Sequence, residues 1–222
     1  MCGRFTLAAE LADLKAEFAG IQFPAPLARR YNVAPSQPVL AIPNDAQAKA
    51  DYFVWGLIPS WAKDASIGNR LINARGETLA EKPAFRSSYK YKRCLVLADG
   101  FFEWKTVPGT KAKTPIYVQL EHGTPFGMAG LWSAWHAADG SEVRSCTIIT
   151  TAPNALIAPI HNRMPVILRA EDRSKWLDPA PQSPDVLGHL LQPYPAERMK
   201  AFAVSTLVNN PGIDRAECVL PS

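Results

Sequence analysis

The stretch RCLVLADGFFEW (93–104) is the longest of the apolar runs that favour β-strands in this chain. Seven shorter runs resemble it: PVLAI (38–42), DYFVWGLI (51–58), PIYVQL (115–120), FGMAGLW (126–132), SCTIITT (145–151), MPVIL (164–168) and AFAVS (201–205). Because strands dominate and helical patterns are confined to the ends and connections, we expect an α+β fold. Its mainly antiparallel sheet could be open or closed into a barrel-like core with short peripheral helices.

Helices are expected at three places. Apolar residues at i, i+4, i+7 and i+11 directly after the start predict an amphipathic helix. They are Leu7, Leu11, Leu14 and Phe18. Thr6 stands where a side chain could cap that helix. Two further helical patterns lie around 171–177 and 185–191, and the twenty prolines of the chain favour short elements throughout.

The composition is that of a globular protein with a sizeable core. The chain has 222 residues, 47% of them hydrophobic and 20% charged, and it contains no repeat or long linker, so we expect a single domain over 1–222. The proline-rich segment DPAPQSPD (178–185) is interpreted as a surface loop. A net charge of +4 permits a polyanionic partner but is too small to demonstrate one.

No membrane or export signal is found in the sequence. Charged residues interrupt the start of the chain, and no stretch approaches the roughly 18 consecutive apolar residues that a membrane span needs. We therefore expect a soluble cytoplasmic protein without a membrane partner, associated with the nucleoid if its source is bacterial. A monomer is the expected state.

The four cysteines are far apart and form no CxxC pair, which argues against a disulfide framework or a zinc site. No histidine has a metal-ligand spacing either, so neither a metal nor another cofactor is expected. Cys94 and Cys146 lie in strand-like runs, where a buried cysteine behaves as a small hydrophobic residue. Cys2 differs because of its position at the start of the chain.

Removal of Met1, expected before a small second residue, would make Cys2 the N-terminus. An α-amine has a pKa of about 7.7–8.0, so roughly a tenth of it is neutral at pH 7, enough to form a Schiff base with an aldehyde. The neighbouring thiol can then close on the imine carbon to give a thiazolidine ring. On position alone, however, Cys2 is more simply a small core residue.

Seven sequence blocks bear on that choice. They are MCGRF (1–5), RYNVAP (30–35), WGLIPSW (55–61), INARGET (72–78), ADGFFEW (98–104), IITTAPN (148–154) and IHNRMPVIL (160–168). Their order and spacing resemble the SOS-response-associated peptidase (SRAP) family. The resemblance implies a protein that crosslinks to abasic sites in single-stranded DNA through Cys2 and so shields the lesion.

The resemblance assigns three further residues to catalysis. Asn73 in INARGET would hold the amine and thiol by hydrogen bonds, although the bare sequence also fits a turn-forming asparagine. Glu103 lies between aromatic residues, a setting that keeps a carboxyl protonated near neutral pH, and it would open the cyclic abasic sugar. From the residues alone, an outward-facing glutamate on an alternating strand is the favoured interpretation. His161 in IHNRMP would move protons near neutral pH.

DNA contacts are expected from arginines and an aromatic surface. Arg4, Arg75 and Arg163 each lie within two residues of a proposed catalytic position, where phosphates of a bound strand would run. Trp61 follows Pro59–Ser60 and precedes a polar stretch, which favours an exposed ring for base stacking, whereas Trp55 is expected in the core. Some family members have two adjacent aromatics here, but Ala62 follows in this chain.

The resemblance alone adds Asn32, Pro35 and Thr150 to the expected DNA groove. No recognition helix or zinc finger is present, so a single strand containing an abasic site is the expected partner. Two other functions remain open at this point. One is a cysteine peptidase or N-terminal-nucleophile hydrolase that uses Cys2, His161 and Asn73. This alternative includes autoproteolytic removal of Met1. The other is a DNA-binding module without catalysis.

Overall fold

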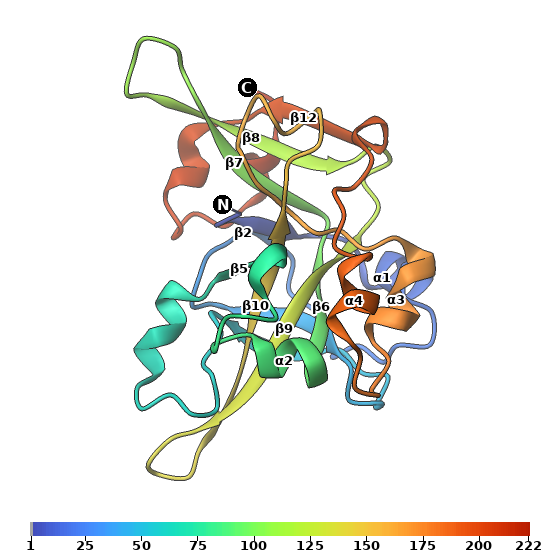
Figure 1. Ribbon diagram of the computed structural model, residues 1–222. Helices are drawn as coiled ribbons and strands as arrows, with labels where there is room; N and C mark the ends of the chain where they lie inside the picture. Colours follow the sequence, from blue (N-terminus) through green and yellow to red (C-terminus); the bar gives the residue numbers. More distant parts are fainter. Residues whose placement is uncertain (1) are drawn as a thin grey trace.

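The computed structural model describes residues 2–222, whose strands form two sheets (Figure 1). The first sheet has the order β12-β8-β7-β1-β2, and its paired strands are all antiparallel. Its strands are β1 (Phe5–Leu7), β2 (Arg30–Val33), β7 (Gly100–Thr106), β8 (Lys113–Leu120) and β12 (Met199–Ala203). This sheet carries the start of the chain and, on β7, the segment that contains Glu103.

The second sheet closes on itself. It contains β3 (Pro38–Pro43), β4 (Asp51–Trp55), β5 (Asn73–Arg75), β6 (Arg93–Ala98), β9 (Phe126–His136), β10 (Glu142–Thr151) and β11 (Met164–Pro165). Because β9 pairs with both β6 and β10, the strands β10-β4-β3-β6-β9 form a five-stranded ring. Among the named strands of residues 2–222, only the β10–β4 and β10–β5 pairings are parallel. The prediction of a mainly antiparallel α+β fold with a barrel-like core is confirmed.

Alternate residues of the ring strands enter two apolar clusters, as the period of two in a strand requires. Cys94 and Val96 of β6 point into the inner cluster, here named the barrel core, together with Cys146 of β10 and residues of β1, β7 and β8. Leu95 and Leu97 point outward, where four short helices cover them. These are α1 (Leu11–Glu17), α2 (Arg86–Tyr91), α3 (Ala170–Trp176) and α4 (Pro184–Gly188).

Short 3-10 turns complete the chain: η1 (Ala65–Arg70), η2 (Gly76–Thr78), η3 (Ala196–Arg198), η4 (Thr206–Asn209) and η5 (Ala216–Val219). Within residues 2–222, no helix is both long and apolar enough to cross a membrane. The segment 178–183 has no regular structure, as expected, and Pro184 then begins α4. Cys94, Cys146 and Trp55 are fully buried, which confirms their expected place in the core.

The longest apolar run is two strands rather than one. Residues 93–98 form β6 of the barrel and residues 100–106 form β7 of the other sheet, so the chain changes sheets at Asp99. The Asp99 amide donates to the Thr6 carbonyl at 3.0 Å, which fixes the corner. Gly100 follows because a side chain there would clash with the ring of Tyr117. This corner directs β7 toward the start of the chain.

The helix predicted from Leu7 was wrong at its start. Leu7 belongs to β1, and α1 begins only at Leu11, after Glu10. Thr6 caps no helix because its buried hydroxyl donates to the Asp99 carboxylate and lies 2.9 Å from the Tyr117 hydroxyl. Pairing of β1 with β2 and β7 therefore overrides the helical spacing of the leucines.

Three other boundaries differ from the prediction. The strand expected over 51–58 ends at Trp55, because Gly56 turns the chain with a φ of 135° that favours glycine. The run 164–168 pairs as a strand only over Met164–Pro165, with Ile167 bridging to β9. Helix α3 confirms the pattern at 171–177, whereas the helix expected over 185–191 ends at Gly188. The strands β2 and β5 and the helix α2 were not predicted.

Candidate active site around Cys2

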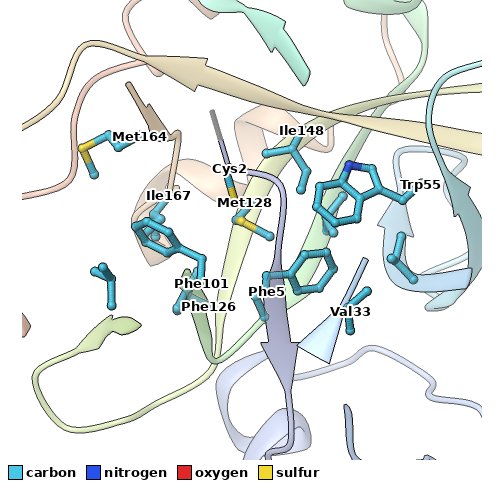
Figure 2. Close-up of a cluster of buried hydrophobic side chains, with 14 of the residues drawn as sticks. Cys2, Phe5, Val33, Trp55, Phe101, Phe126, Met128, Ile148, Met164 and Ile167 are labelled. Carbon is cyan, nitrogen blue, oxygen red and sulfur yellow. The ribbon is translucent and has the colours of Figure 1, made fainter. Parts of the chain in front are cut away.

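Cys2 lies at the edge of the barrel core, just before β1. Cys2 has no exposed surface, and Figure 2 shows its side chain among the apolar side chains of the barrel core, which include Met128 and Ile148. Burial raises the pKa of the Cys2 thiol, and the nearby Glu103 carboxylate raises it further. The thiol is therefore protonated at neutral pH in this state. Met1, whose removal was expected, lies outside the described residues.

Burial alone would fit a plain core cysteine, as it does for Cys94 and Cys146. Cys2 differs from them because the charge of a carboxylate, that of Glu103, acts on its thiol. The Asn73 Nδ2 donates to the Cys2 carbonyl oxygen at 2.7 Å. Strand β5 brings Asn73 there by running parallel to β10, with Asn73 opposite Ile148. The structure thus places Asn73 beside Cys2, as the family resemblance implied.

Glu103 supplies a buried carboxyl to the same place. It lies on β7 opposite Ile116 of β8, and only 2% of it is exposed. Burial raises the pKa of the Glu103 carboxyl to about 7, although the positive charge of Lys113 acts against this. Such a carboxyl exchanges a proton near neutral pH, which suits a general acid. The charge of Glu103 in turn raises the pKa of the Cys2 thiol.

His161 lies in the turn between β10 and β11, and its ring is fixed by the backbone of Arg163. The Arg163 amide donates to the His161 Nδ1 at 3.0 Å, and the Arg163 carbonyl oxygen lies 3.2 Å from the same nitrogen. Partial burial lowers the pKa of His161, and Lys113 lowers it further. The imidazole is therefore neutral at neutral pH and able to accept a proton.

Lys113 is a site residue that the sequence analysis missed. It begins β8, opposite Thr106 at the end of β7, and its charge acts on both Glu103 and His161. The sequence KTVPGTKAKT (105–114) contains three lysines in a turn region, and nothing in it distinguishes one of them. The pairing register of the β7–β8 hairpin would have distinguished Lys113 from the other two lysines.

The proposed DNA residues divide into exposed and buried ones. Trp61 is 60% exposed, as expected for a stacking residue, and it borders a shallow hollow with Lys63 and Arg70. Arg75 is exposed at the end of β5, and Pro35 is half-buried after β2. These positions leave Trp61 and Arg75 accessible to a nucleic acid. Their role in DNA binding stays a prediction.

Arg4, Asn32 and Thr150 instead make internal contacts. The Arg4 Nη1 donates to the Asn32 Oδ1 at 2.7 Å and to the Val208 carbonyl oxygen at 2.6 Å. Asn32 is fully buried, and its amide donates to backbone oxygens between residues 208 and 213. Thr150 is also fully buried. Arg4 and Asn32 thus connect the start of the chain to the C-terminal segment; Arg4 is half-buried, whereas Asn32 and Thr150 have no exposed surface.

Arg163 is held by a carboxylate rather than left open to solvent. Its two Nη atoms bind the two carboxylate oxygens of Glu77 at 2.7 and 2.9 Å, and its Nη2 also donates to the Thr150 carbonyl oxygen at 2.5 Å. A phosphate would have to compete with Glu77 for this guanidinium. Among residues 2–222, no group of three His, Cys, Asp or Glu side chains is arranged to hold a metal ion.

Comparison with known proteins identifies the family. Residues 1–211 match the family model described as SOS response associated peptidase (SRAP). The chain belongs to the SRAP family. Two curated relatives agree with this SRAP assignment. The abasic site processing protein YoqW of Bacillus subtilis (strain 168) is 47% identical over 222 residues, which cover 99% of each chain.

The second relative is the abasic site processing protein HMCES of Pongo abelii. It is 34% identical over 197 residues, which cover 75% of this SRAP chain and 55% of that protein. A crystal structure of a protein from Bacteroides thetaiotaomicron has a TM-score of 0.89 and 29% identity, with both chains fully covered. A Bordetella bronchiseptica structure with a TM-score of 0.79 and 24% identity shares the fold over 92% of this chain and all of that one.

Proposed function

We propose that this SRAP protein senses abasic sites in single-stranded DNA and bonds to them covalently through Cys2, which shields the lesion. The relatives named abasic site processing proteins support the substrate class. The observation that carries the chemistry is the hydrogen bond from Asn73 to the Cys2 carbonyl, because it holds the start of the chain beside the buried Glu103. After loss of Met1, the amine and thiol of Cys2 occupy this position.

The first step concerns the sugar. An abasic deoxyribose is mostly a closed hemiacetal, which does not react with amines. Glu103, whose pKa is about 7, donates a proton to the ring oxygen as the bond between that oxygen and C1′ breaks. The C1′ hydroxyl loses its proton, and an aldehyde results. Because burial raises the pKa of Glu103 into the neutral range, the carboxyl can donate this proton without an acidic medium.

The second step joins protein and DNA. The neutral Cys2 amine attacks the aldehyde carbon, and water leaves as the imine forms. The Cys2 sulfur then bonds to the same carbon, and the thiol proton is transferred to the nitrogen, which closes the thiazolidine. The Asn73 Oδ1 is buried and accepts no hydrogen bond from residues 2–222, so it offers an acceptor for the reacting amine. His161, neutral at pH 7, can accept protons released in these steps.

Sequence-independent binding fits the exposed residues. Trp61 can stack on any base, and Arg75 can pair with a phosphate, so neither contact selects a sequence. A peptidase triad would require the Asn73 amide to orient the imidazole. Here the Asn73 amide donates to Cys2, while the backbone of Arg163 orients His161. The geometry therefore favours crosslinking over a thiol–imidazole–amide peptidase.

The test is a crosslinking assay with a single-stranded oligonucleotide that contains one abasic site. The wild-type protein is expected to give a band that survives denaturing electrophoresis, and Cys2→Ala is expected to abolish it because both the thiol and its ring closure are lost. Cys94→Ala is the matched control, since Cys94 is equally buried in the barrel core but has no role in the proposed chemistry. It should retain the band.

The state of the N-terminus provides a second check. Intact mass measurement of the reactive protein should show that Met1 is absent, and a tag fused before Cys2 should block the reaction because it converts the amine into an amide. The proposal fails if protein that retains Met1 still forms the adduct. It also fails if Cys2→Ala crosslinks as well as the wild type.

A further inference from the structure

The segment from Asn73 to Glu77 contacts both sides of the candidate site. At its first residue, the Asn73 amide binds the Cys2 carbonyl at 2.7 Å. At its last, the Glu77 carboxylate binds Arg163 in the turn that carries His161. Between these points, β5 is fixed against β10 by a parallel pairing. One short segment therefore sets the position of the attacking residue and of the proton acceptor relative to each other.

The contact between Glu77 and Arg163 is geometrically specific. Both carboxylate oxygens accept a hydrogen bond from the guanidinium, an arrangement that orients the two planes. The Arg163 side chain is 16% exposed and that of Glu77 is 54% exposed, so the arginine is the more enclosed partner. Its further bond to the Thr150 carbonyl attaches the turn to the end of β10. The anchored guanidinium restricts the backbone at residue 163.

That backbone holds the imidazole in either protonation state. When the His161 Nδ1 is unprotonated, it accepts from the Arg163 amide at 3.0 Å. When Nδ1 carries a proton, it can donate to the Arg163 carbonyl at 3.2 Å. The backbone of residue 163 thus offers Nδ1 a donor in one tautomer and an acceptor in the other, which restrains the ring. The second ring nitrogen, Nε2, is not used in this contact with residue 163.

We infer that Glu77 is a positioning residue for His161: its carboxylate anchors the guanidinium of Arg163, whose backbone amide and carbonyl hold the imidazole. The inference rests on the proposed function, in which His161 moves protons. The inference also explains why the INARGET block contains a carboxylate, that of Glu77, next to a surface that is expected to bind DNA phosphates. The carboxylate is occupied by Arg163 and does not act as an open negative charge.

The charged groups near His161 determine the direction of the expected effect. The charge of Lys113 on β8 acts on His161, and the ion pair between Arg163, two residues along the chain from it, and Glu77 on η2 lies beside the same segment. Replacing Glu77 by glutamine leaves the Arg163 charge without its partner, next to an imidazole that Lys113 already disfavours as a cation. The pKa of His161 should therefore fall further in Glu77→Gln.

The experiment follows the His161 ring proton by NMR from pH 5 to 8 in the full chain without DNA, with the signal assigned by its loss in His161→Gln. In Glu77→Gln the midpoint is expected to fall by about half a pH unit or more. Arg163→Lys cannot make the two-point contact and should alter the same titration. The double variant should then shift the midpoint by less than the sum of the two single effects.

Glu81→Gln is the matched control, because it removes an equal charge from an exposed position four residues along the chain. It should leave the His161 midpoint unchanged. In the crosslinking assay, the pH profile of the rate should move in the same direction as the midpoint in Glu77→Gln and stay in place in Glu81→Gln. Thermal melting establishes that each variant is folded.

The inference is overturned if Glu77→Gln leaves the His161 titration unchanged and instead tightens binding of intact single-stranded DNA, since Glu77 would then only shield Arg163 from phosphate. It is also overturned if Glu81→Gln shifts the midpoint equally. A wild-type protein that forms no crosslink contradicts the proposed function alone, because the titration is measured without DNA and decides the role of Glu77 separately.

Discussion

Two buried ionisable side chains, Arg93 and Glu103, lie within eleven residues of each other but in opposite circumstances. Arg93 begins β6 and has no exposed surface, yet its guanidinium is surrounded by carbonyl oxygens. They belong to Tyr89, Lys90, Trp176, Asp178 and Ala180, at 2.6 to 3.2 Å. Glu103 on β7 is buried against the barrel core and the start of the chain, and its pKa rises to about 7.

The difference separates a structural charge from a reactive one. Arginine keeps its proton at any physiological pH, so Arg93 serves as a permanent donor that joins β6 to the ends of α2 and α3. Glu103 changes its charge within the physiological range, which makes it costly to the fold when ionised and useful to a reaction when protonated. Burial alone therefore does not identify a catalytic group. The pKa of the buried side chain must be considered together with its hydrogen-bond partners.

Replacement of Arg93 should have the largest effect on stability. Arg93→Met fills a similar volume but leaves five carbonyl groups without their donor, so the free energy of unfolding should fall by about 3–5 kcal/mol. Urea unfolding followed by fluorescence measures this. Arg86→Met, at an exposed position on α2, is the control and should change the value by less than about 0.5 kcal/mol. A comparable small change for Arg93→Met would contradict its structural role.

The pH dependence of Glu103→Gln should be the next largest effect. Because the folded-state pKa of Glu103 lies above its ordinary value, the wild type loses stability as pH rises from about 4.5 to above 7, where the buried carboxyl ionises. Glutamine cannot ionise. Over this pH range the free energy of unfolding of the variant should therefore fall by about 2–3 kcal/mol less than that of the wild type. Crosslinking at neutral pH should nevertheless slow. Parallel stability curves for the two proteins between pH 4 and 8 would refute the assignment.

The sequence predicted the fold class because it depends on local patterns. The eight apolar runs located nine of the twelve strands described, with β6 and β7 taken as one run, and the terminal amphipathic pattern located α1, though not its start. The misses were decided by tertiary pairing. Strand β5 has only three residues and exists because β10 lies beside it, and the break between β6 and β7 depends on a corner formed with Thr6. No local pattern contains that information.

Site residues were found through motif order, and their arrangement needed the structure. The sequence indicated Cys2 by its chemistry at the start of the chain, and Asn73, Glu103 and His161 by resemblance. It could not separate accessible arginines from internal ones, since Arg75 is exposed whereas Arg163 is bound to Glu77. Lys113 was missed because its place depends on the register of a hairpin. The sequence could not predict these features because each depends on contacts between segments that are distant along the chain.

Asp99 is an intermediate case between Arg93 and Glu103. It is a mostly buried carboxyl at the corner between β6 and β7, and burial raises its pKa. It accepts hydrogen bonds from the Thr6 hydroxyl and from the Ala8 amide, at 2.6 Å for the latter, and these bonds act against the rise. Asp99 therefore tests whether fixed donors convert a buried carboxyl into a structural group.

Thr6→Val removes one of those donors and should have the smallest of the three effects, a loss of about 1–2 kcal/mol in the free energy of unfolding. The pKa of Asp99 should rise further, so more of the stability is lost as pH increases and the carboxyl ionises. The deficit of the variant should accordingly be larger at pH 8 than at pH 4. Thr6→Ser keeps the hydroxyl and loses only a methyl group, so its deficit should not depend on pH. If valine and serine behaved alike across this range, the Thr6 hydroxyl would contribute nothing to holding the Asp99 charge, and Asp99 would belong with Glu103 rather than with Arg93.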